Sequence, residues 1–346
     1  MKFKKHLKSV VRKNSQENKL NYKVVLSQNE RNYNIAEGLF KKFISSIEQR
    51  DLFFYPNTDS LIYKLSKFFK LQKYNIMLTP GSDIGIKTIF ESFDVEENEV
   101  ITSNFYFPMY EVYSKIYKTK LIKVNYSNLK FKPRNILSKI NSKTKFIILA
   151  NPNSPVGDKY SINDLKPILD SGVPVVIDEA YHEYTGEESF AKYINQYPNL
   201  IILKTFSKGL GAAGCRIGYI LSNKDNINIL SKLKFMYELS GISIKYAEFI
   251  LDNFSSYKRY IENTMKEKNK LVKQLRNKGY NVIDSNCNWF FIKSSKIIKD
   301  LFRKNNILVK SNTIPNSTEE WIKFNYDLKV KKTEIVDNLL SNENIY

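Results

Sequence analysis

Residues 205–219 read Thr205-Phe-Ser-Lys-Gly-Leu-Gly-Ala-Ala-Gly-Cys-Arg-Ile-Gly-Tyr219, and apolar, strand-like runs border them at 199–203 and 217–221. The segment contains a threonine, a serine, one lysine (Lys208), three glycines within six residues and one arginine (Arg216). Hydroxyls, a permissive backbone and a guanidinium together suit a phosphate dianion. A lysine among them can form a Schiff base with an aldehyde. The segment therefore indicates a site for a molecule that carries both groups.

Pyridoxal 5′-phosphate combines these two groups, and its usual protein partners are a Schiff-base lysine and an acid at the pyridinium nitrogen. Asp178 supplies such an acid, because it ends an apolar run and lies thirty residues before Lys208. Tyr181, three positions further on, can donate to the 3-oxygen of the ring. The alternatives are a solvated lysine in a surface loop and an aspartate that caps a turn. Arg216 weakens the first alternative, because only eight of the 55 basic residues are arginine.

From residue 76 onward, strand-like and helix-like segments alternate, which predicts an α/β fold with a largely parallel sheet covered by helices on both faces. The predicted strands are 76–79, 100–103, 120–124, 146–150, 173–177 and 199–203. In such sheets the functional site lies beyond the carboxyl ends of the strands. The loops at Gly81, Asn151, Asp178 and Thr205 all follow apolar runs directly, so we expect them to meet at one edge of the sheet.

Three regions are predicted along the chain. Residues 1–23 form a polar, basic arm, and 24–240 form a large domain whose N-terminal segment joins the small domain. Residues 241–346 form a connector helix and a small α+β domain. Within the large domain, apolar spacing predicts one helix over 35–50, followed by a turn at 51–57.

The composition narrows the class of protein. A chain of 346 residues with 42% hydrophobic residues can bury a sizeable core. No apolar run reaches the roughly 18 residues of a membrane helix. Cys215 and Cys287 give neither a disulfide framework nor metal-ligand spacing, so a reducing cytoplasm and no metal site are expected. The net charge of +20 raises the question of nucleic acid, but the lysines are spread along the chain and no binding module is recognisable.

Over roughly residues 24–340 the chain resembles a fold-type I pyridoxal-phosphate enzyme of the class I/II aminotransferases, nearest the histidinol-phosphate aminotransferase branch. The motifs that carry the resemblance are Leu26–Glu30, Tyr55-Pro56, Gly81-Ser82-Asp83, Asn151–Gly157, Asp178–Tyr181 and Thr205–Arg216. The resemblance implies a mostly parallel seven-stranded sheet between helices, a smaller C-terminal α+β domain, and a homodimer with shared active sites.

The resemblance also implies roles for individual residues. Lys208 would be the Schiff-base lysine and proton shuttle, with Asp178 on the ring nitrogen and Tyr181 on the 3-oxygen. The residues expected at the cofactor phosphate are Ser82, Asp83, Thr205, Ser207 and Arg216. Those expected at the ring are Phe107, which stacks on it, and Ser154, near the 3-oxygen. Tyr55 would reach the cofactor of the neighbouring subunit, and the expected substrate-binding residues are Asn29, Tyr55, Lys310 and Lys323.

Four positions depart from the family pattern. Ser154 replaces an asparagine, Phe107 replaces a tyrosine, and Lys310 and Lys323 replace two arginines that bind substrate. Lysine offers a point charge where arginine offers a planar fork for a carboxylate. We therefore predict an aminotransferase that acts on a small phosphorylated substrate, with an amino acid as nitrogen donor.

Two alternatives stay open. A decarboxylase of a phosphorylated amino acid, of the phosphoserine or phosphothreonine type, would use the same site, because the bond that is cleaved depends on how the substrate is oriented. A non-enzymatic nucleic-acid-binding regulator is suggested by the charge alone, and its binding to DNA would depend on salt.

Overall fold

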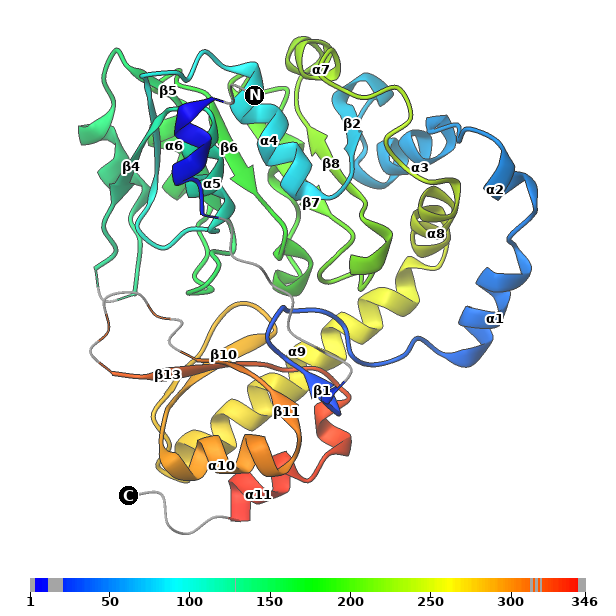
Figure 1. Cartoon of the computed structure of the whole chain (residues 1–346), viewed down its shortest axis with the longest axis vertical. Helices are drawn as coiled ribbons and strands as arrows, with labels where there is room; N and C mark the ends of the chain where they lie inside the picture. Colours follow the sequence, from blue (N-terminus) through cyan, green and yellow to red (C-terminus); the bar gives the residue numbers. More distant parts are fainter. Residues whose placement is uncertain are drawn as a thin grey trace.

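A seven-stranded sheet forms the centre of the large domain (Figure 1). The structure, a computed structural model, describes residues 4–11, 21–127, 129–311, 314, 317 and 319–341. In spatial order the strands are β2 (Ile76–Thr79), β8 (Gly218–Leu221), β7 (Leu200–Thr205), β6 (Val175–Asp178), β5 (Thr144–Ala150), β3 (Glu99–Ser103) and β4 (Lys120–Val124). Strand β8 runs antiparallel to both of its neighbours, and every other adjacent pair is parallel. The predicted fold class is therefore confirmed.

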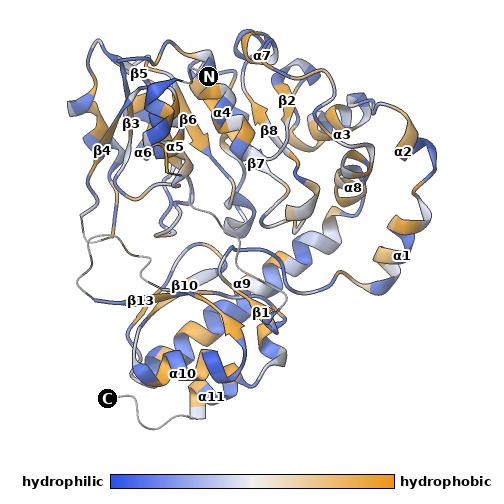
Figure 2. Ribbon diagram, viewed as in Figure 1, coloured by the Kyte–Doolittle hydropathy of each residue, from blue (hydrophilic) through white to orange (hydrophobic). Residues whose placement is uncertain are grey.

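Both faces of this sheet are buried, which is why its strands are apolar at nearly every position. Successive residues of β6 show the alternation, since Val175 and Ile177 belong to one core and Val176 to the other. The second core is covered by α4 (Ser82–Ser92), α5 (Met109–Ile116) and α7 (Lys224–Ser231). The first is covered by α3 (Asp59–Phe69), α6 (Ile162–Leu169) and α8 (Gly241–Asp252). Figure 2 shows the apolar strands between helices with polar outer faces.

The small domain is built on a four-stranded antiparallel sheet. Its strands, in spatial order, are β12 (Lys310–Ser311), β13 (Trp321–Asn325), β10 (Trp289–Lys293) and β9 (Val282–Ile283). Helices α10 (Lys296–Lys304) and α11 (Ile335–Ser341) pack with this sheet around a separate core. The 24-residue helix α9 (Phe254–Asn277) contributes to the cores of both domains and joins them (Figure 1).

The N-terminal segment crosses from the small domain to the large one. Strand β1 (Val24–Val25) pairs in parallel with β11 (Ile307–Leu308), and Leu26 is fully buried in the small-domain core. The chain then passes the carboxyl edge of the large sheet before it enters α1 (Glu37–Ser45). This path carries residues 28–33 to the boundary between the domains.

One predicted element was wrong in detail. The helix expected over 35–50 is interrupted, and a second short helix, α2 (Arg50–Phe53), occupies the start of the expected turn. Local side-chain bonds compete with the helix here. The Ser46 hydroxyl donates to the Phe43 carbonyl at 2.7 Å, and the Asp51 carboxylate accepts from the Glu48 amide at 2.7 Å.

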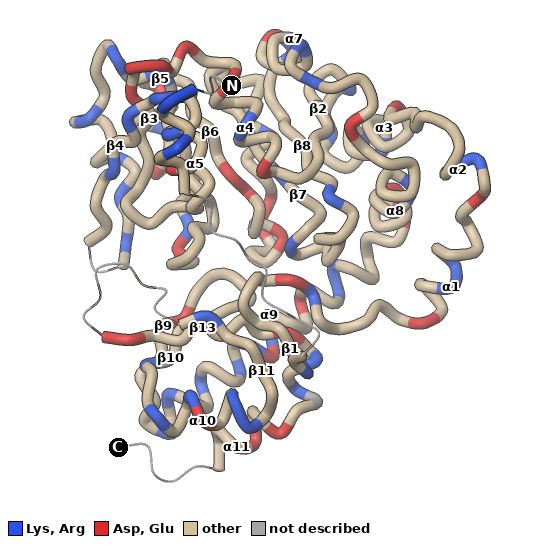
Figure 3. The backbone as a smooth tube through the Cα atoms, viewed as in Figure 1, with Lys and Arg blue, Asp and Glu red and all other residues tan. Residues whose placement is uncertain are grey.

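The distribution of basic residues and the character of the helices bear on possible binding to nucleic acid or membrane. Lys and Arg are spread over the large and small domains alike (Figure 3). Among the helices of the described residues, none combines the length and the apolar character that crossing a bilayer requires.

Candidate active site

The predicted site residues gather because the carboxyl ends of β2, β5, β6 and β7 lie at the same edge of the sheet. Asp178 ends β6 and lies in register with Leu203 of the neighbouring strand β7. Thr205 ends β7, and the loop that carries Lys208 follows it. Ala150, at the end of β5, lies in register with Asp178 on its other side. This edge is where ligands bind in open α/β sheets.

Lys208 reaches from its loop toward the N-terminal segment. Its ammonium donates to the Gln28 carbonyl at 2.9 Å and lies 5.7 Å from the centre of the Tyr181 ring. Tyr181 follows Asp178 by three residues, so the lysine and the acid lie at the same edge of the sheet. Gln28 was not among the predicted residues, because a backbone carbonyl leaves no signal in the sequence.

Asp178 is a buried carboxylate held by two donors. The Tyr110 hydroxyl donates to Oδ2 at 2.9 Å, and the Ala180 amide donates to Oδ1 at 3.1 Å. Burial raises the pKa of Asp178 to about 6, although both hydrogen bonds oppose this shift. Tyr110 was also missed by the sequence analysis; its position three residues after Phe107, at the start of a helix, was the available signal.

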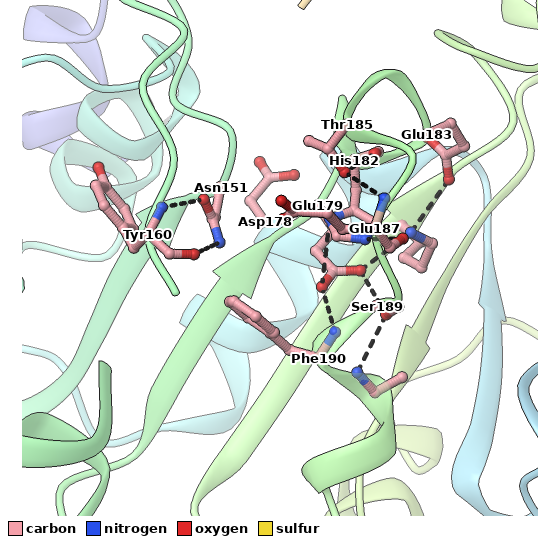
Figure 4. A network of polar contacts seen from close by, with 12 residues as sticks. Asn151, Tyr160, Asp178, Glu179, His182, Glu183, Thr185, Glu187, Ser189 and Phe190 are labelled. Atoms are coloured by element: carbon pink, nitrogen blue, oxygen red, sulfur yellow. Dashed lines mark hydrogen bonds and ion pairs between the residues drawn. The ribbon is translucent and has the colours of Figure 1, made fainter. Parts of the chain in front are cut away.

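The neighbouring acid has a different role. Glu179 forms an ion pair with Lys204 at 3.0 Å and accepts hydrogen bonds from the Ser189 hydroxyl and the Phe190 amide. Figure 4 shows its carboxylate directed away from that of Asp178, as expected for successive residues at a strand end. Glu179 is thus satisfied within the protein, whereas Asp178 has no ion pair among the described residues.

The lack of an ion pair at Asp178 among the described residues allows a test of whether the site fits pyridoxal 5′-phosphate. A buried carboxylate that lacks a cation is stabilised by a protonated ring nitrogen, the partner that the cofactor presents. The phenol of Tyr181 accepts from the Asn29 side-chain amide at 2.9 Å, and the Ser154 and Asn29 side chains oppose the rise that burial causes in the pKa of Tyr181. Asn29, Ser154 and Tyr181 therefore form one polar group near Lys208, suited to an oxygen on the ring. These residues fit the cofactor.

At the residues predicted to bind the cofactor phosphate, backbone segments around Gly81 and Gly218 lie very close to their neighbours. A Cβ at Gly218 would lie 2.4 Å from the Ser82 amide nitrogen, and one at Gly81 would lie 2.6 Å from the Arg216 guanidinium. Arg216 points to the Ser207 hydroxyl at 3.5 Å. The Thr205 hydroxyl lies 3.0 Å from that of Ser207, and the Asp83 carboxylate accepts from Tyr113 at 3.2 Å. Hydroxyls, a guanidinium and the start of α4 thus converge, as phosphate binding requires.

Lys323 is the most unusual group of the site. It is only 5% exposed, and its ammonium lies 3.7 Å from the centre of the Trp289 ring. It forms no hydrogen bond or ion pair within the described parts of the chain. Burial lowers the pKa of Lys323 well below its ordinary value, and the charges of Lys310 and Lys208 lower it further. Lys310 faces Lys323 in the register of β12 and β13.

Two of the predicted site residues, Tyr55 and Lys310, are exposed. Tyr55 is 75% exposed and stacks on Tyr237 with the ring centres 4.0 Å apart. Lys310 is exposed at the edge of the small-domain sheet. Phe107 lies against Tyr110, edge to face, with ring centres 6.0 Å apart. Trp289, which no sequence motif indicated, packs edge-on against Tyr181 at 4.8 Å.

With this geometry established, comparison with known proteins identifies the class of enzyme. Residues 21–338 match the family of class I and II aminotransferases. The chain therefore belongs to this family, and it is a pyridoxal-phosphate-dependent transaminase. The predicted family, enzyme class and cofactor are confirmed.

Particular relatives agree with this assignment. Histidinol-phosphate aminotransferase of Clostridium novyi is 30% identical over 328 residues, which cover 91% of this chain and 90% of that protein. The enzyme of the same name from Pyrococcus furiosus is 29% identical, covering 75% of this chain and 77% of that one.

Solved structures show the same fold. Histidinol-phosphate aminotransferase of Sinorhizobium meliloti, in complex with pyridoxal-5′-phosphate, superposes with a TM-score of 0.84 at 18% identity, covering 99% of this chain and 96% of that one. L-threonine-O-3-phosphate decarboxylase of Porphyromonas gingivalis gives a TM-score of 0.76 at 20% identity, covering 91% and 98%.

Proposed function

We propose that this transaminase moves an amino group between an amino acid donor and a small phosphorylated substrate, of the kind named in its histidinol-phosphate aminotransferase relatives. The observation that carries the proposal is the buried ammonium of Lys323, which has no polar partner within the described chain. An unpaired buried charge is unfavourable, so an anion of the substrate would stabilise it. Lys310 and Lys208 add positive charge to the same region, which suits a phosphate dianion.

The residues at the sheet edge would divide the work on the cofactor. When bound, pyridoxal 5′-phosphate supplies an aldehyde and an electron-withdrawing ring. The Lys208 amine would be its covalent attachment point and, as a free amine, would move a proton on the substrate. Asp178 would hold the ring nitrogen, and Tyr181 and Ser154 would contact the ring oxygen. Phe107 would pack against the face of the ring.

The loops around Gly81 and Arg216 would hold the cofactor phosphate. The amides of Ser82 and Asp83 start helix α4, where the helix dipole favours an anion. The guanidinium of Arg216 and the hydroxyls of Ser207 and Thr205 complete the set. These groups belong to the large domain, whereas Lys310 and Lys323 face each other on the small-domain sheet. The first set would bind the phosphate of the cofactor, and the two lysines would bind that of the substrate.

We propose that the enzyme is a homodimer. An aromatic patch on the large domain is unusually exposed; it consists of Phe53, Phe54, Tyr55, Phe235, Met236 and Tyr237, each at least 52% exposed. Contiguous exposed apolar surface of this kind is typical of a protein interface. A second copy of the chain would cover the patch, and Tyr55 would then approach the cofactor and substrate of the partner. A cytoplasmic location is proposed from the two unpaired cysteines.

Decarboxylation of a phosphorylated amino acid is the second candidate. Lys323 offers a single point charge, so a substrate carboxylate would not be clamped as firmly as by a guanidinium fork. Such weak clamping is compatible with loss of the carboxylate. The two reactions differ in what they consume and release.

A substrate panel tests the proposed function. Purified enzyme would be supplied with phosphorylated and unphosphorylated forms of the same amines and amino acids, with and without a keto acid. Transamination predicts turnover that requires the keto acid and prefers the phosphorylated amine. Carbon dioxide release without keto acid consumption would favour the decarboxylase. Equal turnover of unphosphorylated amino acids would contradict both.

A further inference from the structure

Tyr110 connects two residues that we place at the cofactor ring. It lies on α5, just after the carboxyl end of β3, and is fully buried. Its hydroxyl donates to Asp178 Oδ2 at 2.9 Å. Its ring meets that of Phe107 at an interplanar angle of 80°. One side chain therefore contacts both the acid assigned to the edge of the cofactor ring and the aromatic residue assigned to its face.

We propose that Tyr110 is a positioning residue, whose hydroxyl keeps Asp178 ionised and aimed at the ring nitrogen of pyridoxal 5′-phosphate while its ring fixes Phe107. This inference rests on the roles proposed above for Asp178 and Phe107. Tyr110 itself would not touch substrate or cofactor.

The hydrogen bonds of Asp178 explain how one hydroxyl can orient it. Among the described residues, Tyr110 gives the only side-chain hydrogen bond to this carboxylate, and the Ala180 amide holds the other oxygen. An ionised carboxylate accepts about four hydrogen bonds, so acceptor positions remain for a ring N–H. Two donors from different elements fix the plane of the carboxylate. Without the hydroxyl, only the amide would do so.

The same hydroxyl opposes the effect of burial. Burial raises the pKa of Asp178 to about 6, and the charge of Glu179 raises it further. The Tyr110 hydrogen bond opposes the increase most strongly, followed by the Ala180 amide and the charge of Lys204. Tyr181 also lies near Asp178, and burial raises its pKa. Burial raises the pKa of Tyr110 well above its ordinary value, so its phenol stays protonated and acts as a donor.

Loss of the Tyr110 hydroxyl should weaken cofactor binding at acid pH and leave it almost unchanged at alkaline pH. Only ionised Asp178 can pair with a protonated ring nitrogen, and removing the hydroxyl moves the pKa of Asp178 upward, toward neutral pH. Above both pKa values, wild type and Tyr110→Phe would bind the cofactor almost equally. As pH falls through the higher pKa of the variant, the variant would lose affinity first. Below the wild-type value of about 6, the ratio of affinities would level off.

The experiment measures the affinity of the apoprotein for pyridoxal 5′-phosphate by fluorescence titration, from about pH 5.5 to about pH 8.5. We expect Tyr110→Phe to bind about tenfold more weakly than wild type at the acid end and within about twofold at the alkaline end, as for loss of one hydrogen bond to a charged group. Thermal unfolding of each apoprotein at the same pH values checks the fold. A ratio that does not change with pH would overturn the inference.

Tyr117→Phe is the matched control. Tyr117 directly follows α5, and its hydroxyl donates to Glu91 at 3.3 Å and not to Asp178. The substitution removes the same atom, so its cofactor affinity should follow wild type at every pH. If Tyr110→Phe fails to fold, 3-fluorotyrosine at position 110 gives an independent test. Its more acidic hydroxyl donates more strongly, and the pH dependence should shift in the opposite direction; no shift would count against the inference.

Asp178→Asn separates failure of this inference from failure of the proposed site. If Asp178 holds the ring nitrogen, the variant should bind the cofactor weakly at all pH values, and adding Tyr110→Phe should change nothing more. Unchanged affinity in Asp178→Asn would refute the assignment of Asp178 itself. Weak binding by Asp178→Asn together with normal binding by Tyr110→Phe would refute only the role of Tyr110.

Discussion

At the scale of single residues, the candidate site contains two buried ionisable groups, one acidic (Asp178) and one basic (Lys323). Burial raises the pKa of Asp178 and lowers that of Lys323, so in each case it disfavours the charged form. Both shifts would be relieved by a bound ligand, the first by a ring nitrogen and the second by a substrate anion. Charged groups that are buried at a cost in the free protein are typical of functional sites, where some folding stability is lost in favour of ligand binding.

Lys323→Met tests this trade-off. The variant removes an unpaired buried ammonium, so we expect the ligand-free protein to unfold at a higher temperature than wild type. The Michaelis constant for the phosphorylated substrate should rise by roughly 10- to 100-fold, as for loss of a hydrogen bond to a charged group. Lys296→Met, at an exposed position of α10, should change neither quantity. A lower unfolding temperature in Lys323→Met would mean that the ammonium stabilises the free protein.

Lys208→Ala tests the covalent attachment point. We expect transamination to fall by at least about 10³-fold, because both the nucleophile and the proton carrier are lost. Reduction with borohydride followed by peptide mass spectrometry should find a phosphopyridoxyl group on Lys208 in wild type and on no lysine in the variant. Modification of another lysine in wild type would show that Lys208 has been misassigned.

At the scale of elements, the site depends on how closely backbone segments approach. Gly218 starts β8, and the position of its missing Cβ lies 2.5 Å from the Gly81 carbonyl carbon and 2.9 Å from the Lys204 carbonyl oxygen. The turn that starts α4 therefore rests directly on β8. This contact aligns the helix N-terminus with the Arg216 loop, which a side chain at position 218 would push away.

Gly218→Ala should disrupt this contact. Because backbone must move, we expect destabilisation of about 2–4 kcal/mol, by analogy with overpacking of a core, and weaker cofactor binding. Gly38→Ala is the control, since a Cβ there meets no atom within 4 Å. In helix α1 that change should stabilise by about 0.5–1 kcal/mol. Denaturant unfolding and cofactor titration measure both effects, and equal stability of the two variants would contradict the contact.

At the scale of the whole molecule, the candidate site receives contacts from both domains and from the N-terminal segment. Gln28 and Asn29 contact Lys208 and Tyr181 of the large domain, while β1 of the same segment pairs with the small domain. A second contact joins the Trp289 indole to the Pro155 carbonyl at 2.9 Å. A change in the relative orientation of the two domains would therefore alter the contacts around both Lys208 and Ser154.

The dimer can be tested through complementation. In analytical ultracentrifugation, the wild-type protein should have twice the 40.6 kDa mass of one chain. Phe235→Asp, in the exposed aromatic patch, should reduce the mass to that of the monomer, whereas Ile297→Asp on the small domain should leave the dimer intact. Lys208→Ala and Tyr55→Ala, each with low activity, should recover about a quarter of wild-type activity when refolded together in equal amounts, because half of the dimers gain one intact site. No recovery would place Tyr55 at the site of its own subunit.

The fold, and the gathering of the candidate site residues at one edge of the sheet, followed from local patterns in the sequence. Alternating strands and helices specify a parallel sheet, and the carboxyl edge of such a sheet places Ser82, Asp178 and Lys208 together without further information. The strand bounds expected at 76–79 and 120–124 agree with the structure. The helix expected over 35–50 was less accurate, because hydrogen bonds of Ser46 and Asp51 compete with it.

Only the tertiary structure decided which side chains meet. Tyr110 and Asp178 are 68 residues apart in the sequence, and Trp289 and Lys323 are 34 residues apart. No periodic pattern in the sequence relates the members of such pairs. Burial is likewise a property of the folded molecule. The sequence shows that residue 323 is a lysine, but only the structure shows that this lysine is buried and has no polar partner among the described residues. Local order is encoded by neighbours in the sequence, whereas hydrogen bonds and charge shifts in the site depend on distances that exist only after folding.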